Sequence, residues 1–261
     1  MNLIPKKSLG QNFLNDKKIL NKIVESGEIC EKDSVLEIGP GTGNLTEIIL
    51  SKKPKKLIVV EKDKELSLKL SKKFKNNIEI INTDILDYFD KLKFKEPLKV
   101  FGNLPYNISS QILVNFIRFK KWPPNFTDLI FMFQKELAEK ITGQFSEKNY
   151  GRLSILNSFR FKVSKKFLVS PNCFVPKPKV YSSVLHFKPK KKLGFKIKNI
   201  TTLEKVTHTF FSNKRKIIRK NIIKLLNSEK IKLLKEIDLT KRPSEIKPEI
   251  YYKISELLER K

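Results

Sequence analysis

Short apolar runs alternate with amphipathic segments over the first half of the chain. Segments with apolar residues at helical spacing separate the runs, and strands that alternate with helices predict a parallel, Rossmann-like α/β sheet. The runs are rich in β-branched residues and are predicted to be buried strands at residues 35–38, 57–60, 78–84, 95–103 and 128–134.

The alternation continues beyond the fifth predicted strand. Residues 160–169 and 180–187 predict two more strands, the last one antiparallel, which gives a seven-stranded sheet. Residues 171–178 contain three prolines, and because proline has no N–H to donate, we expect no regular ladder there. Helices are expected at residues 137–142 and 150–158.

The composition changes at residues 188–192, where Lys-Pro-Lys-Lys-Lys marks a predicted domain boundary. We expect residues 1–188 to form the α/β domain and residues 189–261 a small all-helical domain. Within the second domain one long amphipathic helix is predicted at residues 201–226. Shorter helices are expected around residues 229–237 and 248–258.

A glycine-rich turn follows the first predicted strand. Gly39, Gly41 and Gly43 alternate with other residues, and glycine lets a main chain approach a ligand closely. The pattern is neither Gly-x-Gly-x-x-Gly nor the phosphate loop, which disfavours a pyrophosphate ligand. Glu-x-Gly-x-Gly-x-Gly at residues 37–43 instead resembles motif I of the S-adenosylmethionine-dependent methyltransferases. The alternative is a turn whose glycines serve only the backbone.

Two acidic residues strengthen the ligand hypothesis. Glu61 ends the second predicted strand and could accept hydrogen bonds from both hydroxyls of a ribose. Asp84 ends the third, where methyltransferases use an acid to accept from the adenine amino group. Because the carboxyl ends of parallel strands border one crevice, both acids and the glycines predict a nucleoside site. The alternative for each acid is a solvated charge or a helix cap.

The fourth predicted strand ends in Asn103-Leu104-Pro105-Tyr106, beside the same crevice. An aromatic amine is a poor nucleophile because its lone pair is delocalised into the ring. The Asn103 side-chain oxygen and the Leu104 carbonyl could accept from its N–H groups and draw the nitrogen toward tetrahedral geometry. Pro105 would stiffen the turn, and Tyr106 could stack on the base. No nucleophilic side chain is needed, since the protein has mainly to position the reactants.

The Asn-Leu-Pro-Tyr turn, with further stretches, resembles the ribosomal RNA adenine N6,N6-dimethyltransferase family over nearly the whole chain. Two of the stretches are similar to the bacterial small-subunit branch, at residues 210–216 and 242–245. The macrolide-resistance branch, which acts on large-subunit RNA, is the alternative. The remaining matches are Gly-Gln-Asn-Phe-Leu at residues 10–14 and Phe-Val-Pro-Lys-Pro-Lys-Val at residues 174–180.

The resemblance implies roles for individual residues. Tyr106 and Phe174 would sandwich the target adenine, although a loop aromatic that fills a gap is the alternative for Phe174. The cofactor would be S-adenosylmethionine. Its implied contacts are Asn12, Leu14, Gly39, Glu61, Asp84 and Asn103.

The resemblance also implies the reaction and its setting. Methyl groups would go to N6 of two adjacent adenosines in the 3′-terminal hairpin of small-subunit (16S) rRNA, within a 30S particle. The protein would be a cytoplasmic monomer that needs neither a membrane nor a metal. A non-catalytic ribosome-assembly RNA-binding factor is a second class, disfavoured by the acids and the Asn-Leu-Pro-Tyr turn. A small-molecule methyltransferase is a third, disfavoured by the basic C-terminal domain.

The net charge of +28 predicts a polyanionic partner. Only seven of the 55 basic residues are arginines, so an A+T-rich genome could explain the lysines instead. Residues 188–261, however, hold 22 Lys and Arg against 8 Asp and Glu, which is half of the net charge. This concentration favours nucleic acid. Lys216, Lys220 and Lys224, four residues apart on one face of the long predicted helix, are candidate contacts.

Other classes of protein are disfavoured by the composition. No apolar run approaches the roughly 18 residues of a membrane span, and the N-terminus lacks the apolar core of a signal peptide. Two cysteines, Cys30 and Cys173, are too few for a disulfide framework or a cysteine-rich zinc site. His186 and His208 stand alone in the sequence and receive no chemical role.

Overall fold

The computed structural model describes residues 5–6, 9–92, 96–234 and 237–260. The start of the fourth predicted strand at Lys95 and part of the helix predicted at residues 229–237 therefore lie outside the described residues. The chain divides into two compact units. The first consists of Met1–Ala138 and Val163–Pro189, and the second of Glu139–Lys162 and Lys190–Lys261.

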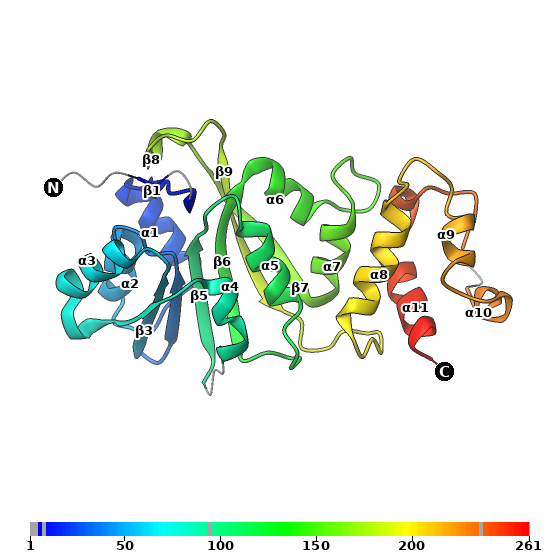
Figure 1. Ribbon diagram of the computed structural model, residues 1–261, viewed down its shortest axis with the longest axis horizontal. Coiled ribbons are helices and arrows are strands. Elements are labelled where there is room, and N and C mark those ends of the chain that lie inside the picture. Colours follow the sequence, from blue (N-terminus) through cyan, green and yellow to red (C-terminus); the bar gives the residue numbers. More distant parts are fainter. Residues whose placement is uncertain (1–4, 7–8, 93–95, 235–236, 261) are drawn as a thin grey trace. The chain divides into compact units, whose positions relative to one another are not determined.

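The first unit contains the expected seven-stranded sheet (Figure 1). The order across the sheet is β4 (Glu79–Asn82), β3 (Lys56–Glu61), β2 (Ser34–Ile38), β5 (Leu98–Asn103), β6 (Phe126–Gln134), β9 (Ser182–Pro189) and β7 (Phe161–Val169). The first five strands in this order are parallel, and β9 is antiparallel to β6, with Met132 opposite Val184. The prediction of a Rossmann-like sheet with an antiparallel last strand is confirmed.

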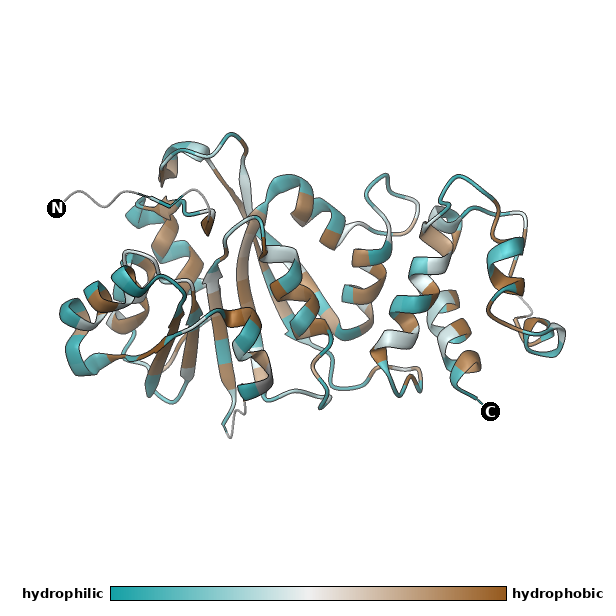
Figure 2. Cartoon of the chain, viewed as in Figure 1, coloured by the Kyte–Doolittle hydropathy of each residue, from teal (hydrophilic) through white to brown (hydrophobic). Residues whose placement is uncertain are grey.

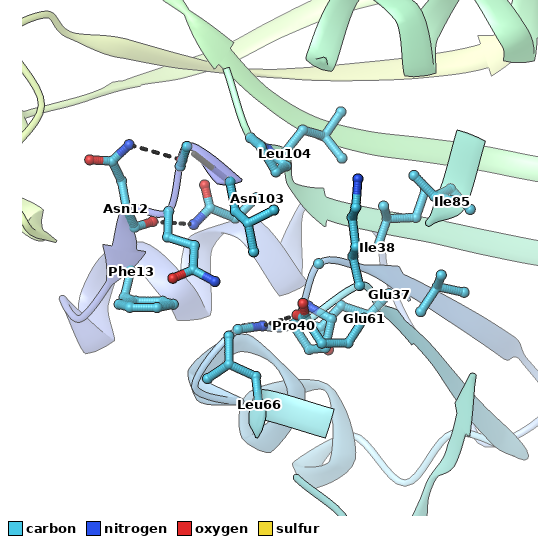
Figure 3. A pocket seen from close by; sticks show the side chains of 18 of the residues that line it. Asn12, Phe13, Glu37, Ile38, Pro40, Glu61, Leu66, Ile85, Asn103 and Leu104 are labelled. Atoms are coloured by element: carbon cyan, nitrogen blue, oxygen red, sulfur yellow. Dashed lines mark hydrogen bonds between the residues drawn. The ribbon is translucent and has the colours of Figure 1, made fainter. Parts of the chain in front are cut away.

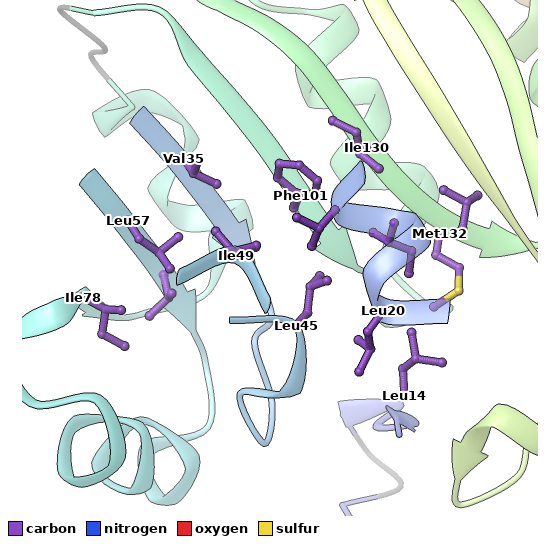
Figure 4. Close-up of a cluster of buried hydrophobic side chains, with 14 of the residues drawn as sticks. Leu14, Leu20, Val35, Leu45, Ile49, Leu57, Ile78, Phe101, Ile130 and Met132 are labelled. Atoms are coloured by element: carbon purple, nitrogen blue, oxygen red, sulfur yellow. The ribbon is translucent and has the colours of Figure 1, made fainter. Parts of the chain in front are cut away.

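Helices cover both faces of this sheet. Along β2, Val35 packs into a cluster under α1, α2 and α3, while the next residue, Leu36, is equally buried on the opposite face (Figure 4). On that opposite face, the Phe116 ring of α5 lies 5.5 Å from Phe131 of β6. The helices of the first unit are α1 (Lys17–Glu25), α2 (Asn44–Ser51), α3 (Lys64–Phe74), α4 (Ile85–Tyr88) and α5 (Ser109–Ile117). The next helix, α6 (Lys135–Thr142), begins in the first unit and ends in the second.

The second unit is helical, and residues 139–162 belong to it rather than to the α/β unit where the predicted boundary places them. The reason is the packing of α7, whose Phe159 ring lies 5.0 Å from the Tyr252 ring. The other junction, Pro189/Lys190, falls one residue from the predicted boundary. The helices are α7 (Arg152–Arg160), α8 (Ile200–Phe211), α9 (Arg219–Ile223), α10 (Ser228–Lys232) and α11 (Pro248–Glu259).

The single long helix predicted at residues 201–226 is wrong. It is two helices, α8 and α9, separated by a turn at residues 212–218. The turn carries a run of polar residues, and the Ile218 N–H donates to the Lys241 carbonyl, 2.9 Å away, instead of to a helical partner. Lys216 therefore lies in the turn, apart from Lys220 on α9, although both are exposed.

A second correction concerns residues 171–178, where no ladder was expected. Phe174–Val175 forms a short strand, β8, antiparallel to β1 (Phe13–Leu14). Leu14 lies opposite Phe174, and Phe13 opposite Val175. The prolines on either side keep this ladder to two residues, because they cannot donate a further hydrogen bond.

The distribution of apolar residues matches this layering. The strands and the inward faces of the helices are apolar, and the outward faces are polar (Figure 2). In the described part of the chain, no helix combines the length and the apolar character that crossing a bilayer requires.

Candidate active site

A cavity opens at the carboxyl ends of the parallel strands, between β2 and β5, where the strand order reverses (Figure 3). The loops after β2, β3, β4 and β5 line it, together with residues 9–14. The structure brings nearly all of the sequence-predicted site residues to this cavity. Those residues are Asn12, Leu14, Gly39, Gly41, Glu61, Asp84, Asn103, Leu104, Pro105 and Tyr106.

Phe174 is placed differently. Its side chain is 2% exposed and packs in the core cluster that also contains Leu14. Of the two aromatic residues expected to sandwich an adenine, only Tyr106 borders the cavity in this conformation. A stacking role for Phe174 stays a prediction.

The glycine loop has backbone angles that favour glycine. Gly39 and Gly41 have φ values of +67° and +58°, in the left-handed region. A Cβ on Gly41 would also come within 2.9 Å of the Phe13 ring. A Cβ on Gly39 would project between Pro105 and the Asn103 carbonyl, about 4 Å from each, so this glycine leaves a cradle in the cavity wall.

Glu61 holds the loop together and faces the cavity. One of its carboxylate oxygens accepts from the Gly41 N–H at 3.1 Å, and the other accepts from the Asp63 N–H at 2.8 Å. Burial raises the pKa of Glu61, partly offset by these two hydrogen bonds. A carboxylate has about four lone-pair positions, so both oxygens keep the capacity to accept from ligand hydroxyls.

Glu37, at the start of the glycine motif, is 1% exposed. Burial raises its pKa to about 8, even though it accepts from the Thr46 hydroxyl at 2.7 Å, and the charge of Glu61 adds to the rise. Glu37 is therefore mostly protonated at neutral pH. A neutral Glu37 reduces the repulsion that Glu61 experiences when it ionises.

Asp84 caps a helix and also lines the cavity. Its Oδ1 accepts from the Leu86 N–H at 2.9 Å and caps α4, and its Oδ2 lies 2.7 Å from Lys62 Nζ. Burial opposes ionisation, but the Lys62 and Leu86 hydrogen bonds outweigh it, so the pKa of Asp84 is lowered. The group is a fixed, charged acceptor at the edge of the cavity.

The orientation of the Asn103 amide follows from its partner. Its Nδ2 donates to the backbone carbonyl of Asn12 at 3.0 Å (Figure 3). A carbonyl can only accept, so the amide nitrogen must take this side, and the oxygen must point the other way. The Asn103 amide is thus held in one orientation beside Leu104, and both residues line the cavity.

Tyr106 is held by a residue that no sequence pattern indicates. Its hydroxyl lies 2.6 Å from the hydroxyl of Ser182, which is fully buried on β9. Burial raises the pKa of Tyr106, and the Ser182 hydrogen bond partly offsets the rise. The ring therefore carries no charge at neutral pH and is fixed at the cavity wall, the state that stacking on a base requires.

No metal site accompanies these groups in the described part of the chain. There, no cluster of three or more His, Cys, Asp or Glu side chains is arranged to hold an ion. The residues named above offer hydrogen bonding, charge and stacking.

Comparison with known proteins identifies the family. The model of the family described as ribosomal RNA adenine dimethylase matches residues 3–260. The chain belongs to this family. One member, the ribosomal RNA small subunit methyltransferase A of Pelagibacter ubique (strain HTCC1062), is 47% identical over 256 residues, covering 95% of each chain. The protein of that name from Malacoplasma penetrans (strain HF-2) is 40% identical over 252 residues, covering 95% of this chain and 90% of its own.

Solved structures have the same architecture. A dimethyladenosine transferase from Plasmodium falciparum superposes with a TM-score of 0.76 at 28% identity, covering 93% of this chain and 95% of its own. The 23S rRNA methyltransferase ErmE superposes with a TM-score of 0.74 at 23% identity, covering 95% and 100%. At that identity the second likeness shows the fold alone. Dimethylase-family membership and the shared fold agree with the resemblance seen in the sequence.

Replacing Glu37 by Gln should reduce the dependence of stability on pH. The unfolded chain ionises Glu37 near its ordinary pKa of 4.5, whereas the folded protein ionises it near 8. The folded state therefore keeps a proton that the unfolded state loses, and the stability from this group falls as pH rises between those values. The loss is at most about 1.4 kcal/mol per pH unit. Gln still accepts from Thr46 but cannot ionise.

The check is the unfolding free energy of both proteins from about pH 5 to about pH 8.5, measured in urea. Wild type should lose more stability than Glu37→Gln over this range. Parallel pH profiles for the two proteins would show that Glu37 is not protonated in the fold.

Proposed function

We propose that this chain transfers methyl groups from S-adenosylmethionine to N6 of two adjacent adenosines in the 3′-terminal hairpin of small-subunit rRNA, within a 30S particle. The chain would act as a monomer in the cytoplasm. The observation that carries the proposal is the fixed Asn103 amide, which lines the cavity beside Leu104 and whose nitrogen donates to the Asn12 carbonyl. Membership of the dimethylase family and the 47% identical small-subunit relative support the substrate.

The cavity has residues that fit the cofactor. The Gly39 cradle leaves room for close approach to the main chain, Glu61 offers two carboxylate oxygens to ribose hydroxyls, and Asp84 offers a charged acceptor to an adenine amino group. When bound, S-adenosylmethionine supplies an electrophilic methyl group on a sulfonium whose leaving group is a neutral thioether. Asn12 and Leu14 line the same cavity from the N-terminal side.

The residues around Asn103 would activate the target amine. The Asn103 oxygen and the Leu104 carbonyl would accept its two N–H groups and favour a tetrahedral nitrogen, whose lone pair is no longer delocalised into the ring. Tyr106, held through Ser182, would stack on the flipped base. The chain's own contribution is thus orientation and hydrogen bonding, without a nucleophilic side chain.

Glu61→Ala should weaken cofactor binding far more than RNA binding. It removes the acceptor proposed for two ribose hydroxyls, at a cost on the order of 1–3 kcal/mol. Glu61→Gln keeps one acceptor oxygen and should lose less. Calorimetry with S-adenosylhomocysteine measures the effect, and unchanged affinity in both variants would refute the ribose role.

RNA affinity should fall steeply with salt, and the C-terminal lysines should account for much of the slope. Each neutralised phosphate contributes roughly −0.7 to −0.9 to the log–log slope. Reversing the exposed Lys216, Lys220 and Lys224 to Glu should therefore flatten the dependence of small-subunit affinity on salt concentration.

A matched control reverses Lys52, Lys53 and Lys69, which are exposed on the first unit. This triple variant changes the net charge by the same amount and should keep the wild-type slope. Equal flattening in both variants would mean that total charge, not the C-terminal lysines, sets the affinity. An unchanged slope in the first variant would indicate that the contact lies elsewhere.

Asn103→Ala should abolish most methyl transfer while the fold and RNA affinity persist. Its oxygen is proposed to bind the amine most tightly in the transition state, and removing one preorganised partner of this kind typically costs about 10²–10³ in rate. The measurement is single-turnover transfer of a labelled methyl group at saturating cofactor and small subunits. Near wild-type rates would mean that the Asn-Leu-Pro-Tyr turn is only structural.

Tyr106 variants provide the comparison. Tyr106→Ala removes the stacking ring, worth roughly 1–3 kcal/mol per base, and should weaken capture of the adenine. Tyr106→Phe keeps the ring, loses only the Ser182 hydrogen bond, and should be mild. A loss in Tyr106→Phe as large as in Tyr106→Ala would contradict the stacking role.

A further inference from the structure

Residues 10–14, which we call the strap, lie against several loops of the cavity. Two carbonyls of the strap accept side-chain hydrogen bonds. The Asn12 carbonyl accepts from Asn103, and the Leu14 carbonyl accepts from Asn44 Nδ2 at 2.9 Å. Asn44 directly follows the glycine loop. The strap thus touches the loops that carry both the proposed cofactor site and the proposed amine acceptor. What fixes the strap therefore fixes Asn103.

One end of the strap is held by β8, through the two-residue ladder of Phe13 and Leu14. The other end is held by the Gln11 side chain, whose amide is bonded on both sides. Its Nε2 donates to Asp63 Oδ2 at 3.2 Å, and its Oε1 accepts from the Lys6 N–H at 2.8 Å. Asn12, whose carbonyl orients Asn103, directly follows Gln11 in the chain.

Asp63, which accepts from Gln11, is a buried side chain with several hydrogen-bond partners. It is 5% exposed, caps α3 by accepting from the Glu65 N–H at 2.9 Å, and lies 3.0 Å from Lys6 Nζ. Burial opposes its ionisation, but the Lys6 and Gln11 hydrogen bonds outweigh burial, so the pKa of Asp63 is lowered. Its own N–H donates to Glu61, so the same residue touches the proposed ribose acceptor.

We propose that Gln11 and Asp63 are positioning residues for methyl transfer. They hold the strap so that the Asn12 carbonyl fixes the Asn103 amide with its oxygen at the cavity. This inference rests on the proposed function, and it adds two residues that act through the Asn12 carbonyl. Without the Gln11–Asp63 hydrogen bond, the Asn12 carbonyl loses its fixed position, and the Asn103 amide is free to turn its N–H groups toward the amine.

The test is a double-mutant cycle on the single-turnover rate of methyl transfer, at saturating cofactor and small subunits. Gln11→Leu keeps a side chain of similar size but removes both amide hydrogen bonds, and we expect it to lower the rate about 10- to 100-fold. In an Asn103→Ala background, Gln11→Leu should lower the rate less than about twofold further, because its effect passes through Asn103.

Two further variants control for stability. Asn21→Leu removes another amide hydrogen bond, from Asn21 Nδ2 to the Lys17 carbonyl on α1, outside the cavity lining, and should leave the rate unchanged. Asp63→Asn keeps an oxygen that can cap α3 but loses the charge that faces Lys6 and Gln11. It should reproduce the Gln11→Leu defect with a similar thermal midpoint to wild type.

The outcomes separate this inference from the proposed function. Multiplicative losses in the Gln11→Leu/Asn103→Ala protein, or a wild-type rate for Gln11→Leu, would overturn the positioning role while the function stands. Wild-type protein that transfers no methyl group to adenine N6 would overturn the function itself, and the positioning role with it.

Discussion

The parallel direction of β2, β3, β4 and β5 is the constraint on which the rest of the structure depends. It brings the carboxyl ends of four strands to the same end of the sheet, and the strand order reverses there between β2 and β5. The residues there come from distant parts of the sequence, yet each occupies the same position relative to its strand. If one of these strands were antiparallel, the residue at its carboxyl end would lie at the opposite end of the sheet, away from the others.

Three acidic side chains, Glu37, Glu61 and Asp84, line the cavity and would repel one another if all were charged in the same environment. In the fold, each has a different environment. Glu37 is buried, with a pKa near 8, and therefore mostly neutral. Glu61 accepts two backbone N–H groups, and Asp84 is paired with Lys62. The neutral Glu37 and the separate partners of Glu61 and Asp84 reduce the repulsion among the acids, so the cavity can present acceptors to a nucleoside.

The strap also lines the cavity, and no local periodicity of the sequence predicts this position. The strap lies about 90 residues from Asn103 and about 160 from β8 in the sequence, and its contacts are single hydrogen bonds and a two-residue ladder. Its polar residues would be ordinary in a solvated tail. Here they satisfy buried groups instead, and so couple the N-terminus to the cavity.

The parts of the molecule that could be predicted from sequence are those governed by local periodicity. The buried strands and the strand ends at Glu61 and Asn103 follow from runs of a few residues. The Gln11–Asp63 bond and the Ser182 contact of Tyr106 join distant residues with no periodic signal, so pattern alone could not find them.

The same limit explains the errors. Apolar residues on both sides of residues 212–218 keep helical spacing, but the Ile218 N–H finds its partner at Lys241, in a distant segment. The position of residues 139–162 in the chain predicts the α/β domain, whereas the Phe159 ring packs against Tyr252 of α11 and the Tyr150 ring against Phe211 of α8. In both cases a tertiary contact decided the structure.

The fixed Asn103 amide is proposed to direct methylation to adenine N6 of small-subunit rRNA. The most direct measurement is to incubate the protein with labelled S-adenosylmethionine and small subunits that lack the modification, and to map the product bases by mass spectrometry. The expected product is N6,N6-dimethyladenosine at two adjacent positions of the 3′-terminal hairpin. Label on another ring atom or another RNA, or no label at all, would contradict it.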